Sequence, residues 1–274
     1  MKLVRILLPI NQHGTTASCA GAAFSLAEQF GASLEVLHPC LAPVERLPYA
    51  TELSPVYFEE LIDVGKKQVA LEQRKAREWL ATVARSHPNV QADFVPVEGL
   101  AGPSVATRAK VADLTILPSI DKGEDGFWAS ARGAALFHSG RPLLVMPKEA
   151  SGAIGETVFV AWKDEVEAVR AIAAAEPFLA KAKRVRLVSV SEHGEDETAA
   201  AMVDYLTKAG LPVELTKLAG DAREAGEVLL EAAIGEGVLL VMGAYGHWRW
   251  REWVFGGATD YVLRHTAVPV LMTH

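Results

Sequence analysis

The chain has 274 residues, of which 50% are hydrophobic and 22% charged, an ordinary composition for a folded protein of roughly two domains. Its 27 Lys and Arg against 34 Asp and Glu leave a formal net charge of −7, so neither nucleic acid nor an anionic membrane is expected as partner. Two cysteines exclude a disulfide framework, no apolar run is long enough to span a membrane, and the start lacks a signal-peptide pattern. We therefore expect a cytoplasmic protein.

Short apolar runs alternate with amphipathic helical patterns along the whole chain. The runs are residues 3–9, 33–38, 90–97, 114–118 and 142–146, and then 158–162, 184–190, 212–218, 238–242 and 268–272. Apolar residues on consecutive positions, as in VLLVM, are typical of strands covered on both faces. Strands that alternate with helices predict βαβ units and a parallel sheet.

A long insert follows the second run of the first half. Four prolines within residues 38–55 indicate a loop, and residues 56–86 then show a helical pattern. Its candidate buried positions are Leu61, Val64, Trp79, Leu80 and Val83. The second half has a shorter helix at the corresponding place, about residues 196–209.

The two halves repeat one plan, so we predict an α/β fold with two tandem five-stranded parallel sheets. The expected domains are residues 1–148 and 157–274, and the small, polar residues 149–156 form the linker. A proline opens the fifth strand of each half, where it loses no hydrogen bond of the sheet.

Three glycines follow the run at 238–242 with two and nine residues between them: Gly243, Gly246 and Gly256. Glycine lets a backbone approach a ligand, and free amides at a helix start bind anions. If the strand order is 3-2-1-4-5, ligands bind between the first and fourth strands, at their carboxyl ends. The glycine loop and the AWKDE segment would then flank one phosphate-binding crevice. The alternative is that the glycines only form a tight turn and a helix start.

The glycine pattern, the five repeated strand–helix units and the closing VLRHTAVPVLM resemble the universal stress protein family, and the whole chain resembles its tandem form. The resemblance implies Rossmann-like sheets of the adenine nucleotide alpha hydrolase type, with ATP bound at the glycine loop. Such proteins commonly place Ser or Thr after the third glycine and Asp at the end of the first strand. Here Gly257 stands directly after the third glycine. The end of the first strand holds Asn11 in the first half and Lys163, followed by Asp164, in the second half. Lysine cannot accept a hydrogen bond from ribose, but it can meet a phosphate.

The predicted nucleotide site therefore lies in the second half. It comprises Ala161, Trp162, Lys163 and Asp164 on one wall, Val188 and Val190 near the base, and Met242, Gly243, Tyr245, Gly246, His247, Arg249, Gly256, Gly257, Ala258 and Thr259 around the phosphates. Arg249 belongs to the segment WRWREW, whose Trp and Arg side chains are equally typical of a protein interface. No prediction is made for magnesium.

The first half departs further from the family pattern. Pro118 and Ser119 stand near the first glycine of the motif, and Asp121, Glu124 and Asp125 would repel a phosphate. We expect this half to be a degenerate partner domain. Since no nucleophile elbow, Walker motif or metal-ligand spacing occurs, no catalytic or metal-binding residue is predicted and no enzyme is expected, a weak ATPase aside.

The leading hypothesis is a cytoplasmic stress-response regulatory protein that binds an adenine nucleotide, ATP, in its second domain. The alternative is a nucleotide-independent scaffold. In it, residues 142–146 pair antiparallel with residues 268–272, as the resemblance suggests, and the two sheet edges are buried in an internal pseudo-dimer. A third hypothesis, an adenylyl-transferring enzyme, lacks the HxGH-like pair that it requires. The sequence leaves a homodimer of the whole chain open.

Overall fold

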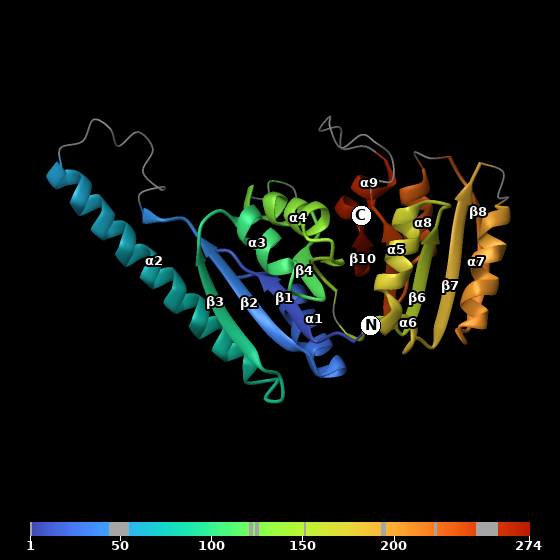
Figure 1. Cartoon of the computed structure of the whole chain (residues 1–274), viewed down its shortest axis with the longest axis horizontal. Coiled ribbons are helices and arrows are strands. Elements are labelled where there is room, and N and C mark those ends of the chain that lie inside the picture. Colours follow the sequence, from blue (N-terminus) through green and yellow to red (C-terminus); the bar gives the residue numbers. More distant parts are fainter. Residues whose placement is uncertain are drawn as a thin grey trace.

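The computed structural model describes residues 2–43, 55–120, 123, 126–150, 152–192, 196–221, 224–244 and 257–274 (Figure 1). Its first half contains β1 (Arg5–Pro9), α1 (Ala17–Phe30), β2 (Ser33–Cys40), α2 (Pro55–Ala84), β3 (Ala92–Glu98), α3 (Ala101–Ala109), β4 (Leu114–Pro118), α4 (Gly126–His138) and β5 (Leu143–Met146). Its second half contains β6 (Thr157–Trp162), α5 (Val166–Ala174), α6 (Glu176–Leu179), β7 (Arg184–Ser191), α7 (Glu197–Lys208), β8 (Val213–Ala219), α8 (Ala225–Ala232), β9 (Val238–Gly243), α9 (Ala258–His265) and β10 (Val270–Thr273).

All these strands belong to one ten-stranded sheet with the order β3-β2-β1-β4-β5-β10-β9-β6-β7-β8. Within each half the strands are parallel in the order 3-2-1-4-5, which confirms the predicted fold class. The halves meet where β5 and β10 run antiparallel, with Leu271 opposite Leu144. This is the pairing of residues 142–146 with 268–272 that the scaffold hypothesis contains, and it leaves neither fifth strand as a free edge.

Helices cover both faces of the sheet, which explains the unbroken apolar runs of the strands. Buried side chains of α1, α2, α5, α6 and α7 form the core on one face. Those of α3, α4, α8 and α9 form the core on the other face. Local signals set the helix ends: Thr16 accepts a hydrogen bond from the Cys19 amide at the start of α1, and Gly31 ends that helix with φ +63°.

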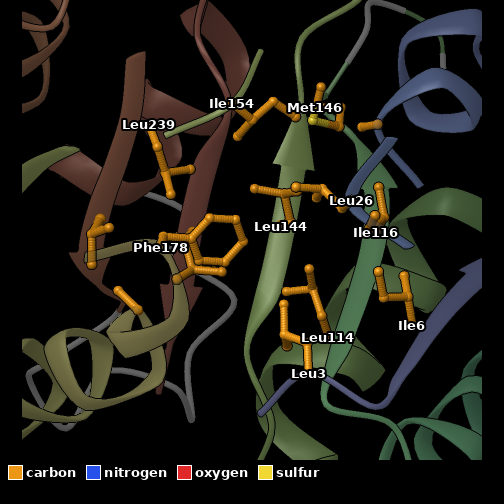
Figure 2. Close-up of a cluster of buried hydrophobic side chains, with 14 of the residues drawn as sticks. Leu3, Ile6, Leu26, Leu114, Ile116, Leu144, Met146, Ile154, Phe178 and Leu239 are labelled. Carbon is orange, nitrogen blue, oxygen red and sulfur yellow. The ribbon is translucent and has the colours of Figure 1, made fainter. Parts of the chain in front are cut away.

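The core on the α1 face continues from one half into the other (Figure 2). The ring of Phe178 on α6 meets the ring of Phe30 on α1 edge to face, with centroids 5.4 Å apart. Beside them, the Lys181 ammonium donates to the Gln29 carbonyl at 2.8 Å and lies 4.4 Å from the Phe30 ring centroid. On the opposite face the Ile120 amide donates to the Leu263 carbonyl at 2.9 Å, so both faces of the sheet hold the halves together.

The long insert forms the predicted helix, but two of its predicted core positions are wrong. Leu80 is buried and Trp79 and Val83 are partly buried, whereas Leu61 and Val64 are 38% and 62% exposed. The reason is that α2 packs on β2 and β3 and that its buried residues among those described, Glu72, Ala76 and Leu80, lie in its C-terminal half. Its N-terminal half extends past the ends of the strands (Figure 1). A helical period shows that one face is apolar, but it does not show how far a neighbouring sheet reaches.

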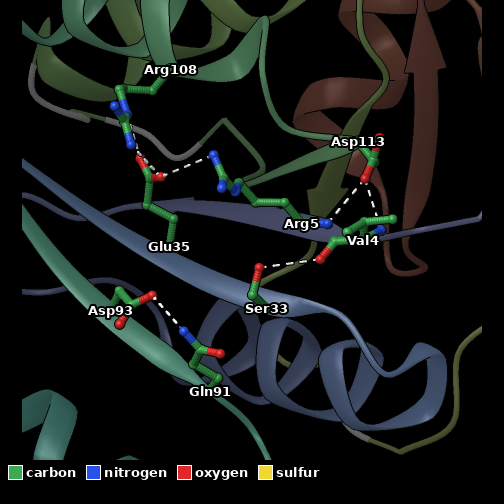
Figure 3. Close-up of polar contacts among 8 residues, drawn as sticks. All are labelled: Val4, Arg5, Ser33, Glu35, Gln91, Asp93, Arg108 and Asp113. Carbon is green, nitrogen blue, oxygen red and sulfur yellow. Dashed lines mark hydrogen bonds and ion pairs between the residues drawn. The ribbon is translucent and has the colours of Figure 1, made fainter.

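A group of polar contacts lies at the amino ends of the first strands (Figure 3). Glu35 on β2 is buried and accepts two hydrogen bonds from the Arg108 guanidinium, at 2.6 and 2.5 Å, and Arg5 lies 4.0 Å from it. The Asp113 carboxylate accepts from the amides of Val4 and Arg5 at 2.8 and 3.0 Å. These contacts fasten α3 and β4 to β1 and β2.

Candidate crevice at the carboxyl ends of the second sheet

The strand order of the second half reverses at β6, which lies between β7 and β9. Residues predicted to line the crevice come together there: Ala161 lies opposite Met242 on β9, and Trp162 lies opposite Ser189 on β7. Ligands of open parallel sheets bind beyond the carboxyl ends of strands at such a reversal. The structure therefore brings the first wall and the start of the glycine motif to one place.

The side chain of Trp162 is buried and serves the structure of this wall. Its indole Nε1 donates to the Thr198 hydroxyl at 3.0 Å, and that hydroxyl donates to Asp196 at 2.6 Å. Asp196 caps α7 by accepting from the Thr198 and Ala199 amides, and it also accepts from the Ser189 hydroxyl at 2.5 Å. Burial opposes ionisation of Asp196, but these hydrogen bonds outweigh it and lower the pKa of the carboxyl below its usual value.

Sequence reasoning missed Ser189, Asp196 and Thr198 as part of this wall. An Asp directly before a helical pattern is a recognisable cap signal. However, nothing local to residues 189–198 indicates that the cap reaches an indole on β6.

Lys163 and Asp164 follow β6, and both side chains are exposed. The Lys163 ammonium lies 2.7 Å from a Glu165 carboxylate oxygen, and 66% of the lysine side chain remains accessible. The end of β6 therefore carries an accessible cation whose charge is partly balanced by a neighbouring carboxylate. Toward the predicted base position, Val188 is buried and Val190 is half-buried beside Gly220.

Gly243, the first glycine of the motif, ends β9 against the start of α5. A Cβ atom here would lie 2.7 Å from the Ala168 nitrogen and 2.7 Å from the Glu167 carbonyl carbon, both main-chain atoms. The Thr273 hydroxyl also donates to the Glu167 carbonyl, at 3.3 Å. Close packing of a helix on the strand thus accounts for this glycine without a ligand.

Gly243→Ala is expected to lower the free energy of unfolding by about 1–3 kcal/mol, because backbone must move to admit the methyl group. Gly133→Ala in α4 is the matched control, since no described residue lies within 4 Å of a Cβ there. Alanine in that helical position is expected to stabilise the protein by about 0.5–1 kcal/mol. Urea denaturation of both variants measures the two effects, and a Gly243→Ala protein as stable as its parent would contradict the packing role.

Gly257 directly precedes α9 and has φ +104° and ψ −175°. A serine or threonine, which the family resemblance led one to expect here, would be strained in this conformation. Among the residues that the structure describes, none comes within 4 Å of a Cβ placed at Gly257. The nearest hydroxyl residue, Thr259, is buried, and Ala258 is the first residue of the helix.

An anionic side chain already occupies the first turn of α9. Asp260 accepts from the Arg264 guanidinium at 2.9 Å through Oδ2, and its buried Oδ1 has no hydrogen-bond partner among the residues that the structure describes. This carboxylate competes with a phosphate for the positive end of the helix. Of the predicted site residues, Tyr245, Gly246, His247, Arg249 and Gly256 lie outside the described residues.

The corresponding end of β1 in the first half is closed by local contacts. Asn11 and Gly14 exchange two main-chain hydrogen bonds of 3.0 Å, and the Asn11 side chain accepts from the His13 amide at 2.8 Å. Trp79 of α2 lies over Gly14. Asp121, Glu124 and Asp125 lie outside the residues that are described.

Among the described residues, no group of three His, Cys, Asp or Glu side chains could hold a metal ion. In the same part of the chain, no helix is long and apolar enough to cross a membrane. Both cysteines are buried free thiols, and burial raises the pKa of Cys19 to about 11. A hollow of about 580 Å³ lies away from the crevice, between α1, the segment after β5 and the loops that precede β9 and β10.

Comparison with known proteins finds one family that the second half resembles. Residues 143–274 match the model of the universal stress protein family. Universal stress protein Slr1230 from Synechocystis sp. is 37% identical over 91 residues, which are 32% of this chain and 31% of that protein. The matched region thus spans about a third of the curated relative.

Solved structures resemble the whole chain. A universal stress protein from Archaeoglobus fulgidus has a TM-score of 0.70 at 19% identity and covers 98% of this chain and 97% of its own. A putative universal stress protein from Pseudomonas aeruginosa has a TM-score of 0.61 at 15% identity and covers 99% of this chain and 93% of its own. At such identities the likeness shows the fold.

Proposed function

Because the chain carries a universal stress protein domain over residues 143–274, we propose that it is a stress-response regulatory protein whose second half binds an adenine nucleotide, ATP. The ligand lies in the crevice at the carboxyl ends of β6 and β9. The first half is a partner domain without a ligand. The function is one of binding, with no catalytic residue assigned, and it is exerted in the cytoplasm, a compartment that suits two unpaired cysteines.

The observation that carries this proposal is Gly257 at the start of α9, which has a positive φ and no described residue within 4 Å of its Cβ position. It lies in a half whose glycine motif begins at the strand reversal beside β6. Main-chain amides at a helix start can hold a phosphate when no side chain covers them. Lys163 supplies an accessible positive charge on the other wall. The residues described thus suit the phosphates better than the ribose, because a lysine stands where the family's carboxylate would accept from the ribose hydroxyls.

Lys163→Glu is expected to weaken ATP binding about tenfold or more, because it places a negative charge beside the phosphates. Lys183→Glu is the matched control: both lysines are exposed and each lies close to a carboxylate, at 2.7 Å from Glu165 and 2.8 Å from Glu156. Lys183 lies at the amino end of β7, away from the crevice, so its replacement should leave affinity unchanged. Isothermal titration calorimetry with ATP measures both. Equal effects of the two substitutions, or no binding to the parent protein, would count against the proposal.

A second candidate function is a nucleotide-independent scaffold. Two observations favour it. Asp260 in the first turn of α9 opposes the binding of a phosphate there. The sheet is continuous through β5 and β10, and this pairing of the two halves needs no ligand. Mass spectrometry of small molecules released on denaturing freshly purified protein separates the two functions. A released adenine nucleotide supports the binding protein, and its absence together with silent calorimetry supports the scaffold.

A further inference from the structure

The N-terminal half of α2 carries apolar side chains in solvent. Tyr57 is 65%, Leu61 38% and Val64 62% exposed, and Leu71 further along is half-buried. With Gln68 between Val64 and Leu71, these positions alternate in steps of four and three residues. We refer to these five residues as the α2 seam. Such spacing on one helix is that of the contact line between two helices of a coiled coil.

The α2 seam differs from the face by which α2 packs on its own sheet. That face carries Glu72, Ala76 and Leu80, which are buried. At about 100° per residue, the centre of the seam lies roughly a quarter turn away from it. One flank of the seam is already covered, because Pro43 lies so close to Gly65 that a Cβ there would be 2.8 Å from the proline Cβ. The opposite flank is open and carries charged residues.

On the open flank, Glu60 and Lys67 are both exposed and lie seven residues apart. If a second α2 packs antiparallel, with Leu61 facing Val64 of the other copy, Glu60 of each copy faces Lys67 of the other. In an antiparallel pair, the open flank of one helix faces the open flank of the other. Both Glu60–Lys67 ion pairs therefore form on that side. A parallel pair would instead direct these charges toward the flank that Pro43 covers.

The position of α2 in the molecule suits the antiparallel arrangement. The N-terminal half of the helix extends away from the sheet (Figure 1). Two copies joined there in opposite directions carry their sheets at opposite ends of the helix pair. The contact is then the same on both partners, as a twofold dimer requires.

We infer that two copies of this chain associate through antiparallel pairing of their α2 seams, with reciprocal Glu60–Lys67 ion pairs that fix the orientation. This association concerns the inserted helix and does not depend on nucleotide binding. The association is favourable because it removes the exposed apolar side chains of both seams from water.

Sedimentation equilibrium over a range of concentrations tests the association. The parent protein should approach twice the mass of the chain as concentration rises. Val64→Glu should raise the dissociation constant about tenfold or more, because it places a charge in an apolar contact. Val111→Glu is the matched control, at a valine 57% exposed that lies outside α2. It should leave the association unchanged, and far-UV circular dichroism should show both variants folded.

Charge exchange tests the orientation. Glu60→Lys and Lys67→Glu should each weaken self-association, because each places like charges opposite one another. Mixing the two single variants should restore dimers between unlike chains, and the double variant E60K/K67E should dimerise like the parent. Zero-length carbodiimide coupling of isotope-labelled and unlabelled parent protein should join Glu60 of one copy to Lys67 of the other.

Two outcomes would overturn the inference. The first is a parent protein that stays monomeric at every concentration, in which case the seam faces solvent or a different protein. The second is a dimer that Val64→Glu leaves unchanged. A dimer that Val64→Glu weakens, but that single charge reversals do not affect, would overturn the antiparallel register.

Discussion

Phe178→Ala is expected to lower the free energy of unfolding by about 3–5 kcal/mol, the usual cost of removing a buried aromatic ring. The residue is 2% exposed, and its ring meets Phe30 of the other half edge to face. Figure 2 shows it between Leu239 of the second half and Leu144 of the first. The cavity would open in the part of the core that both halves share, so both halves should lose stability.

Urea denaturation at neutral pH measures this loss, and hydrogen exchange at the Leu144 and Leu271 amides reports on the β5–β10 junction. Phe137→Ala is the matched control, because Phe137 is 38% exposed and touches the His274 ring at 5.0 Å between centroids. It should cost about 1 kcal/mol or less. A Phe178→Ala protein that loses no more than this control would contradict a shared core.

Arg108→Leu is expected to cost about 3–5 kcal/mol, because it leaves the Glu35 carboxylate buried without its main partner. The Glu35 side chain is 8% exposed, and among the described residues the ion pair that it keeps is with Arg5, at 4.0 Å. The hydrogen bonds to Glu35 raise the pKa of Arg108, and a guanidinium is charged at neutral pH in any case. Denaturation by urea at neutral pH measures the change.

The double variant Glu35→Leu with Arg108→Leu distinguishes a buried charge from simple loss of packing. It should recover most of the stability, since no unpaired charge remains. Arg74→Leu is the exposed control: Arg74 and Glu78 are 3.8 Å apart and both 69% exposed, so its loss should cost about 1 kcal/mol or less. If the double variant is no more stable than Arg108→Leu alone, the ion pair is not the cause.

Much of the fold could be predicted from local pattern. Apolar runs such as VLLVM, each followed by a helical period, predicted the strand–helix alternation, and proline at the start of each fifth strand helped to align the two halves. The order 3-2-1-4-5, which was assumed in locating the ligand between the first and fourth strands, is the observed one in each half. That the carboxyl ends of β6 and β9 are neighbours could be predicted too, because it follows from this strand order alone.

The roles of individual residues at the crevice could not be predicted in this way. The sequence left two interpretations of Gly243, and the structure accounts for it by the backbone of α5 that lies against it. Trp162 was predicted to face a ligand, yet its indole is committed to Thr198, which lies 36 residues further along the chain. Neither contact leaves a signal near the residue concerned.

The amino-acid sequence by itself determined the class of fold, the duplication and the places of the helices and strands. These depend on hydrophobic period and capping, which act over a few neighbouring residues. Only the tertiary structure decided which part of α2 is buried, which glycine is required by packing and which polar groups are paired. Each of these depends on the distance between segments far apart in the chain, and that distance is fixed only when the sheet and its helices have packed together.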